Sequence, residues 1–111
     1  MHVYRASEAT SVEPAGHFGG LNVSDVVSRS KGGNYAVQLS YCPPGGGGEK
    51  HAHDADAQLF LVIEGELTFD TGQQRFTLHE REGVLFEVGE PHATLNESDK
   101  LSVTVVVTVA Q

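Results

Sequence analysis

Three histidines and one glutamine have the residue types and the spacing of a metal site. His51 and His53 are two residues apart, and residues two apart in a strand point to the same face, so both imidazoles can reach one point. Gln58 follows them and opens the apolar, β-prone run 58–63. His92 lies far downstream, where a Gly/Pro turn ends and a new strand is expected. If these four side chains converge, their imidazoles and amide oxygen would bind one divalent transition ion, for which Zn, Ni, Mn and Fe are candidates.

Strands are expected to carry these residues. Apolar and polar residues alternate with a period of two along much of the chain, and helical periodicity is almost absent. Short strands separated by Gly- and Asn-rich turns predict an all-β sandwich or barrel. The Gly run 45–48 lacks the Gly-Lys-Ser/Thr ending and following helix of a phosphate-binding loop, so we expect it to form a tight backbone turn. The expected strands are 20–27, 34–41, 58–63, 66–70, 73–78, 84–88, 92–96 and 100–109.

The segment 45–65 resembles the first motif of the cupin superfamily. That motif reads Gly, five residues, His-x-His, three or four residues, Glu, six residues, Gly. This chain has each of these spacings, with Gln58 in place of the Glu. The matching positions are Gly45, His51, His53, Gln58 and Gly65.

The segment 83–96 resembles the second cupin motif, which reads Gly, five residues, Pro-x-Gly, two residues, His, three residues, Asn. The matching positions are Gly83, Gly89, His92 and Asn96, and the Pro-x pair is missing, which shortens the turn before His92. The resemblance implies a double-stranded β-helix, or jelly-roll cupin barrel, formed by a small single-domain protein of the cupin_2 type. We therefore expect one cupin domain over residues 1–111.

Length, composition and charge favour a single domain and disfavour several classes of function. The 111 residues, 39% of them apolar, suffice for one core, and no run has the length of a membrane-spanning helix. The start lacks the layout of a secretory signal and Cys42 is the single cysteine, so we expect a cytoplasmic protein without an internal disulfide. The formal charge of −8 disfavours binding to nucleic acid or to an anionic membrane.

The Gln in place of the motif's Glu changes the charge of the expected site. A divalent ion with three imidazoles and one carboxylate has a net charge of about +1, whereas an amide leaves about +2. The ion would be a stronger Lewis acid and would attract an anionic ligand more strongly. The lost negative charge also disfavours a trivalent ion, which favours non-redox chemistry.

Alternation within the expected strands predicts which side chains line the pocket. If Gln58 faces the lumen, alternate residues of its strand should also do so, and so should alternate residues of the strand that begins at His92. On the strand 34–41, Gln38 and Ser40 share one face and are further candidates. No general acid or base is identified. The substrate-pocket candidates are Gln38, Ser40, Phe60, Val62, Thr94 and Asn96.

The remaining histidines and the last strand lead to two further expectations. His2, His17 and His79 are interpreted as surface or structural residues. The run 100–109 has valines on alternate positions, and exposed valines on a terminal strand would favour association, so we expect a homodimer formed through a strand edge.

Three functions remain open. The first is a metal-dependent enzyme acting on a small oxygenated molecule, either a Lewis-acid lyase or isomerase or a dioxygenase. The resemblance includes small cupins that open and ketonise unsaturated uronates, whose carboxylate would need a cation. The last expected strand has no charged residue after Lys100, which leaves Arg75 of the strand 73–78 as the available cation. The alternatives are a non-catalytic, metal-dependent module that binds or senses a small ligand, and a barrel with an empty site.

Overall fold

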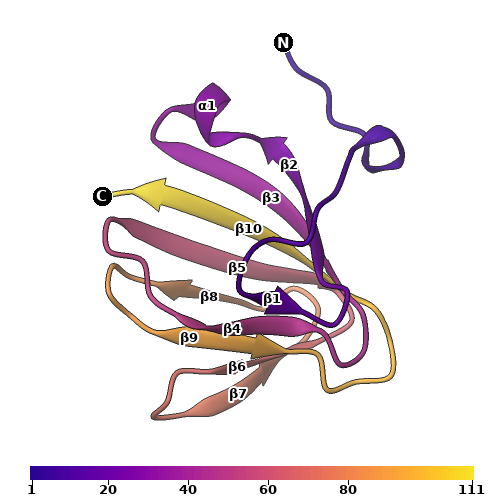
Figure 1. Cartoon of the computed structure of the whole chain (residues 1–111), viewed down its shortest axis with the longest axis vertical. Coiled ribbons are helices and arrows are strands. Elements are labelled where there is room, and N and C mark those ends of the chain that lie inside the picture. The colour runs from indigo at the N-terminus through magenta and orange to yellow at the C-terminus, as the bar shows by residue number, and fades with distance from the viewer.

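Two antiparallel five-stranded sheets face each other and form a jelly roll (Figure 1). The computed structural model describes all 111 residues. One sheet has the order β2-β3-β10-β5-β8 and the other β1-β4-β9-β6-β7. The strands are β1 (His17–Phe18), β2 (Asn22–Val27), β3 (Tyr35–Cys42), β4 (Gly47–His51), β5 (Asp56–Glu64), β6 (Leu67–Asp70), β7 (Arg75–Leu78), β8 (Gly83–Phe86), β9 (His92–Leu95) and β10 (Ser102–Ala110).

The helical content is small. A 3-10 turn, η1 (Ala6–Glu8), and a single-turn helix, α1 (Arg29–Gly32), lie outside the sheets. Neither element has the length and apolar content that a membrane span requires. The prediction of an all-β jelly roll is confirmed.

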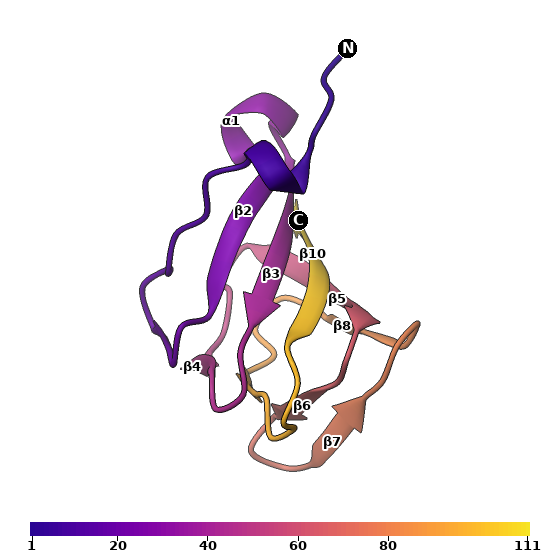
Figure 2. The same ribbon diagram turned by 90° about the vertical axis from the view of Figure 1, so that its right-hand side faces the viewer.

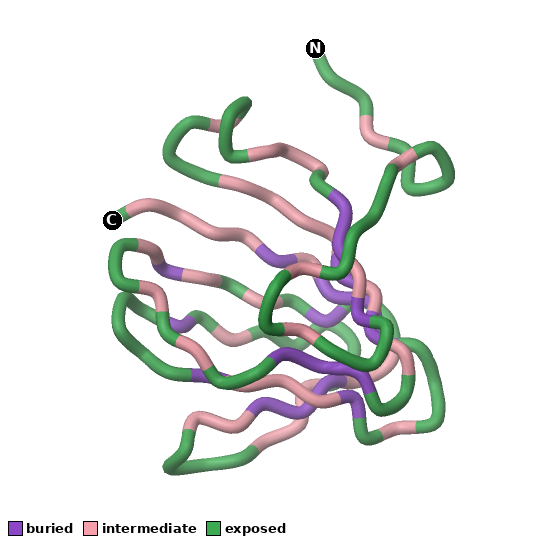
Figure 3. Tube along the Cα trace, viewed as in Figure 1, coloured by how far each residue is buried: buried purple, intermediate pink, exposed green.

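The core lies between the sheets, toward the end at which they come closest. Figure 3 shows most of the buried segments gathering at that end, while the opposite strand ends are mainly half-buried or exposed, with Ala57, Phe86 and His92 as buried exceptions. The cluster joins residues of both sheets and excludes water from the barrel floor. Its buried members are Leu21, Val23, Cys42, Val62, Leu67, Phe69 and Phe86.

Each of the eight expected strands has a counterpart in the structure, with ends shifted by a few residues, and two strands were missed. β1 has only two residues, too few for a periodic signal. β4 begins inside the Gly run that was expected to be a turn. Gly47 lies against β9, where an added Cβ would be 2.1 Å from the carbonyl oxygen of Thr94, so only glycine allows this close pairing.

The terminal strand β10 is central in its sheet, which corrects the expected route to a dimer. It pairs with β3 on one side and β5 on the other, and Figure 2 shows it beside β3. Its backbone groups are therefore already paired, and it offers no free edge. The outward valines lie on the face of the sheet instead.

Candidate metal centre

Three imidazoles converge between the sheets. His51 is the last residue of β4 and His92 the first of β9, and the two are cross-strand partners with ring centroids 4.6 Å apart. His53 is not in a strand, contrary to expectation, but its ring centroid is 5.0 Å from that of His51. One ring nitrogen from each histidine lies within 4.8 Å of the other two. The two distant motifs therefore supply one cluster of potential metal ligands.

A backbone hydrogen bond places the loop that carries His53. The amide of Gly89 donates to the carbonyl of His53 over 2.9 Å. Gly89 belongs to the turn between β8 and β9, directly before His92, so this bond joins the two motif segments next to the cluster. The shortened turn thus still brings His92 to the other histidines.

Gln58 faces the cluster from the opposite sheet. Its Oε1 is 3.1 Å from Nε2 of His53 and 3.1 Å from Nε2 of His92. Its amide nitrogen donates to Oγ1 of Thr108, its cross-strand partner on β10, over 3.1 Å. That bond uses the amide nitrogen and leaves the amide oxygen directed at the imidazoles.

The proton count at His92 shows that these groups fit a cation. Nδ1 of His92 is 3.1 Å from the carbonyl oxygen of Glu90, and Nε2 is 3.1 Å from Oε1 of Gln58, so both ring nitrogens face acceptors. Burial lowers the pKa of His92 from 6.5 to about 4, so near pH 7 the ring is neutral and has a single N–H. With the amide oxygen of Gln58 toward the ring, one of the two contacts therefore brings two lone pairs together.

A metal ion would remove this conflict. Two donors that share an ion at about 2.1 Å lie roughly 3.0 to 3.4 Å apart, which agrees with the distance between Nε2 of His92 and Oε1 of Gln58. In His51 the Nδ1 lies 2.8 Å from the carbonyl oxygen of Glu49, so Nδ1 carries the proton and Nε2 can ligate. The donors are all neutral, so a divalent ion would keep a net charge of about +2.

A cavity of about 260 Å³ adjoins the histidines. It contains Gln38, Ser40, Phe60 and Thr94 of the expected pocket residues. Phe60 is edge-on to His92, with ring centroids 5.6 Å apart, and contributes to the apolar wall. The cavity wall has no Asp, Glu, Lys or Arg. Its other residues, besides the clustered histidines and Gln58, are Pro14, His17, Leu21, Val23, Leu67, Thr104, Val106 and Thr108.

Two expected pocket residues are placed elsewhere. Val62 is fully buried in the core cluster, because the floor of the barrel closes before its position on β5. Asn96 is 1% exposed and donates to the carbonyls of Cys42 and Lys100, while its Oδ1 accepts from Ser98. Asn96 thus holds together two loops at the barrel floor, and neither residue lines the cavity.

His17 lines the cavity, contrary to its interpretation as a surface or structural residue. Its ring centroid is 6.2 Å from that of His51, and Nδ1 lies 3.0 Å from the carbonyl oxygen of Ala15. Its cross-strand partner is Gly48, where an added Cβ would be 3.0 Å from the imidazole. The missing side chain at position 48 makes room for the ring. By contrast, His79 is exposed beside Glu82, as expected.

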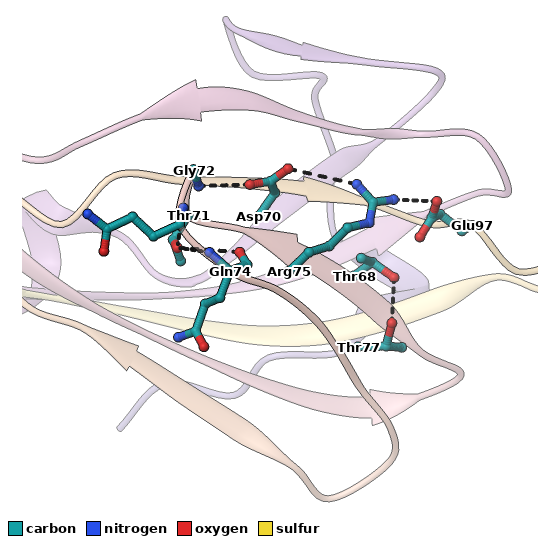
Figure 4. A network of polar contacts seen from close by, with 9 residues as sticks. Thr68, Asp70, Thr71, Gly72, Gln74, Arg75, Thr77 and Glu97 are labelled. Atoms are coloured by element: carbon teal, nitrogen blue, oxygen red, sulfur yellow. Dashed lines mark hydrogen bonds and ion pairs between the residues drawn. The ribbon is translucent and has the colours of Figure 1, made fainter.

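Arg75 is not available to a ligand in the cavity. Figure 4 shows its guanidinium between Asp70 and Glu97 on the outer side of β6 and β7, and both contacts are ion pairs. Arg75 therefore gives no support to a substrate carboxylate at the centre, as a uronate would require.

Comparison with known proteins agrees with this geometry. The sequence model of the Cupin_2 family, described as Cupin domain, matches residues 39–109, which is more than half of the chain and includes the four clustered side chains. The chain belongs to the cupin family. No curated protein matches the sequence of this cupin.

Solved structures resemble this cupin along most of its length. A predicted oxalate decarboxylase from Thermotoga maritima superposes with a TM-score of 0.90 at 18% identity, over 99% of this chain and 100% of the other. A polyketide cyclase from Streptomyces resistomycificus gives 0.84 at 16% identity, over 100% and 80%. The Cupin_2 domain of an XRE family transcriptional regulator from Enterobacter cloacae gives 0.74 at 21% identity, over 84% and 99%. At these identities the similarity shows the fold alone.

Proposed function

We propose that this cupin is a metal-dependent enzyme that acts on a small oxygenated molecule. The observation that carries the proposal is the convergence of three imidazoles with the oxygen of Gln58 beside a small cavity. His51, His53, His92 and Gln58 would hold one divalent transition ion.

The ligand set favours non-redox chemistry. A divalent ion bound here would supply Lewis acidity, polarising a carbonyl or hydroxyl group of the substrate. The neutral donors leave its charge uncompensated, which favours an anionic or strongly polarised oxygen as the substrate group and disfavours a trivalent ion. We therefore place a lyase or isomerase reaction ahead of a dioxygenase reaction. Two structural neighbours carry enzyme names, a predicted oxalate decarboxylase and a polyketide cyclase, which is compatible with this proposal.

Proton transfer in such a reaction would involve His17. Apart from the three clustered histidines, it is the only ionisable side chain of the cavity wall. The carbonyl of Ala15 orients the ring through Nδ1, which leaves Nε2 to exchange a proton with a bound molecule.

A non-catalytic role in binding or sensing is the second candidate. It is favoured by the lack of any carboxylate, lysine or arginine in the cavity wall, because a reaction that moves protons commonly uses such a group. One structural neighbour is a domain of a transcriptional regulator, which is compatible with a sensing role.

Metal content tests the proposal first. Protein purified without added metal should contain about one equivalent of a divalent ion by elemental analysis, and a chelator should lower its thermal stability. His51→Ala and His53→Ala should abolish metal binding, whereas His79→Ala, which removes an exposed imidazole, should not. Substoichiometric metal together with unchanged stability in chelator would instead support a barrel with an empty site.

A substrate panel then separates the enzyme from the binding module. Uronates, diketones and catechols would be assayed for turnover with and without O₂. Turnover that needs the metal but not O₂ supports the Lewis-acid enzyme, and O₂ consumption with a ferric resting state contradicts it. Saturable binding without turnover supports the binding module.

We also propose that the protein is a homodimer formed through the outer face of the β10 sheet. The four outward side chains Leu59, Leu61, Ile63 and Leu85 are 38% to 56% exposed. Val105 and Val107 of β10 lie directly opposite Leu61 and Leu59. We call these six residues the outer apolar face. No charge interrupts them, and burial of such a continuous surface against a second copy would stabilise a dimer.

A further inference from the structure

Two hydroxyl groups at the cavity surface have no hydrogen-bond partner in the protein. Ser40 on β3 and Thr104 on β10 are cross-strand partners, are 9% and 3% exposed, and both line the cavity. The other two threonine hydroxyls of the cavity, on Thr94 and Thr108, each accept a hydrogen bond from a protein N–H group. Unlike the enclosed hydroxyl of Ser102, these two hydroxyls reach the cavity surface, so the Ser40–Thr104 pair is available to bind something in the cavity.

This hydroxyl pair lies at the end of the cavity away from the metal centre. On β10, Thr108 is opposite Gln58, and Thr104 precedes it by four residues. With a strand rise of about 3.3 Å per residue, the two positions are roughly 13 Å apart. Between them, Val106 lines the cavity beside its two cross-strand partners, the apolar Phe60 of β5 and the amide-bearing Gln38 of β3. The amide nitrogen of Gln38 donates to Asp25.

The end with the hydroxyl pair is closed and otherwise apolar. Ser40 is flanked in its sheet by Val23, and Thr104 by the fully buried Val62. Leu21 and Leu67, both of the core cluster, also line the cavity. A group that reaches this end therefore meets two hydroxyls in a dry surrounding, where hydrogen bonds are stronger than in water.

We infer that the Ser40–Thr104 pair is a binding subsite for a neutral oxygen group at the far end of the ligand. Each hydroxyl can donate or accept, so a hydroxyl or carbonyl oxygen is suitable. A carboxylate is disfavoured because no Lys or Arg lines the cavity.

The whole cavity then defines a ligand class. One end of the ligand bears the oxygen group that reaches the metal ligands, its middle is a mainly apolar group about the size of a single ring, and its far end bears a neutral oxygen. The assignment of one ligand end to the metal site rests on the proposed function, whereas the assignment of the hydroxyl subsite does not.

A matched pair of probes tests the subsite in zinc-loaded protein. Benzohydroxamate has a metal-binding head and an apolar ring, and 4-hydroxybenzohydroxamate differs from it only by a hydroxyl at the far end of the ring. Titration calorimetry should show that the hydroxylated probe binds wild-type protein roughly fivefold to tenfold more tightly, as one or two buried hydrogen bonds would give. In Ser40→Ala and in Thr104→Val this ratio should fall to about one, with the affinity for benzohydroxamate unchanged.

Ser102→Ala is the matched control. Ser102 is on the same strand, is fully buried and also has an unpartnered hydroxyl, but it does not line the cavity. The control should keep the wild-type ratio. Thermal melts of all three variants identify any loss of folding. If only one of Ser40→Ala and Thr104→Val folds, that variant is sufficient for the test.

A second pair of probes makes the test independent of the metal. In chelator-treated protein, 4-methylphenol should bind more tightly than toluene, and NMR should locate its shifts at the amides around Ser40 and Thr104. If zinc-loaded protein binds neither hydroxamate, the proposed metal site is rejected. The comparison of 4-methylphenol with toluene then determines whether the Ser40–Thr104 pair is a binding subsite. Equal binding of both members of each pair to wild-type protein, or a preference that persists in both variants, overturns the subsite.

Discussion

Gln58 and Thr108 lie directly opposite each other on β5 and β10, and the amide nitrogen of Gln58 donates to Oγ1 of Thr108 over 3.1 Å. In this orientation the amide oxygen faces the histidines. Because only the amide oxygen can ligate a cation, Thr108 acts as a positioning residue for the proposed metal site.

Thr108→Val should weaken metal binding without removing a ligand. The substitution keeps the side-chain shape but allows the amide to rotate and present its nitrogen, and such supporting contacts are worth roughly 10-fold to 100-fold in metal affinity. Competition with a chromophoric chelator measures the effect on zinc. Thr104→Val makes the same change four residues away and should leave zinc affinity as in wild type; equal loss in both variants would contradict the positioning role.

Gln58→Glu should strengthen metal binding. A carboxylate of the same length places a negative charge at the ion, and the Thr108 hydroxyl can donate to it, so zinc affinity should rise on the order of tenfold or more. Gln73→Glu, in the exposed turn between β6 and β7, makes the same change in net charge and serves as control. If Gln58→Glu changes zinc affinity no more than Gln73→Glu does, Gln58 is not a ligand.

The sequence predicted the features that depend on local alternation. The eight expected strands are present because a period of two is imposed by the backbone itself. The proximity of His51 and His92 also followed from the motifs, although His53 reaches the cluster from a loop. Alternation likewise identified Ser40 and Phe60 as residues of the cavity.

The missed features depend on packing between distant segments. His17 enters the cavity because Gly48 has no side chain. The sequence around either residue does not predict that the two lie side by side. Val62 and Asn96 have the correct alternation for a pocket, but the barrel floor closes before it reaches them. The position of β10 between β3 and β5 depends on the order of strands in the sheet, and the alternation of apolar and polar residues does not predict that order.

Acid should destabilise the metal-free protein through His92. Burial lowers its pKa in the folded state from 6.5 to about 4, so between these pH values the unfolded chain binds more protons than the folded one. The free energy of unfolding therefore falls as the pH falls through this range, by about 3 kcal/mol at most from this residue.

Urea unfolding of chelator-treated protein at pH 7 and at pH 4.5 measures the effect. His92→Phe keeps an aromatic ring against Phe86, on which His92 stacks at a centroid distance of 4.2 Å, and should lose much less stability on acidification. His79→Asn removes an exposed histidine and should behave as wild type. An equal acid loss in His92→Phe and wild type would contradict the assignment.

Asn96→Ala should reduce stability while leaving metal binding intact. The side chain satisfies the carbonyls of Cys42 and Lys100 and accepts two hydrogen bonds from Ser98. Removing it takes a hydrogen bond from the Cys42 carbonyl and an acceptor from Ser98, while the Lys100 carbonyl keeps the bond from the Ser98 hydroxyl, so the loss should cost about 2 to 4 kcal/mol in urea unfolding. Asn22→Ala, which removes an exposed amide, is the control. A loss of zinc affinity in folded Asn96→Ala protein would show that Asn96 serves the site after all.

A charge on the outer apolar face should separate the proposed dimer into folded monomers. Leu61 lies within this face, opposite Val105, and is already 38% exposed in the isolated chain, so Leu61→Lys costs little in the monomer but buries an unpaired charge in the dimer. Sedimentation equilibrium should give twice the chain mass of 11.9 kDa for wild type and the chain mass for Leu61→Lys. Leu101→Lys adds the same charge at an exposed apolar position in the loop before β10 and should remain dimeric. A wild-type protein that sediments as a monomer at every concentration, or a Leu61→Lys protein that remains dimeric, would show that this face does not bind a second copy.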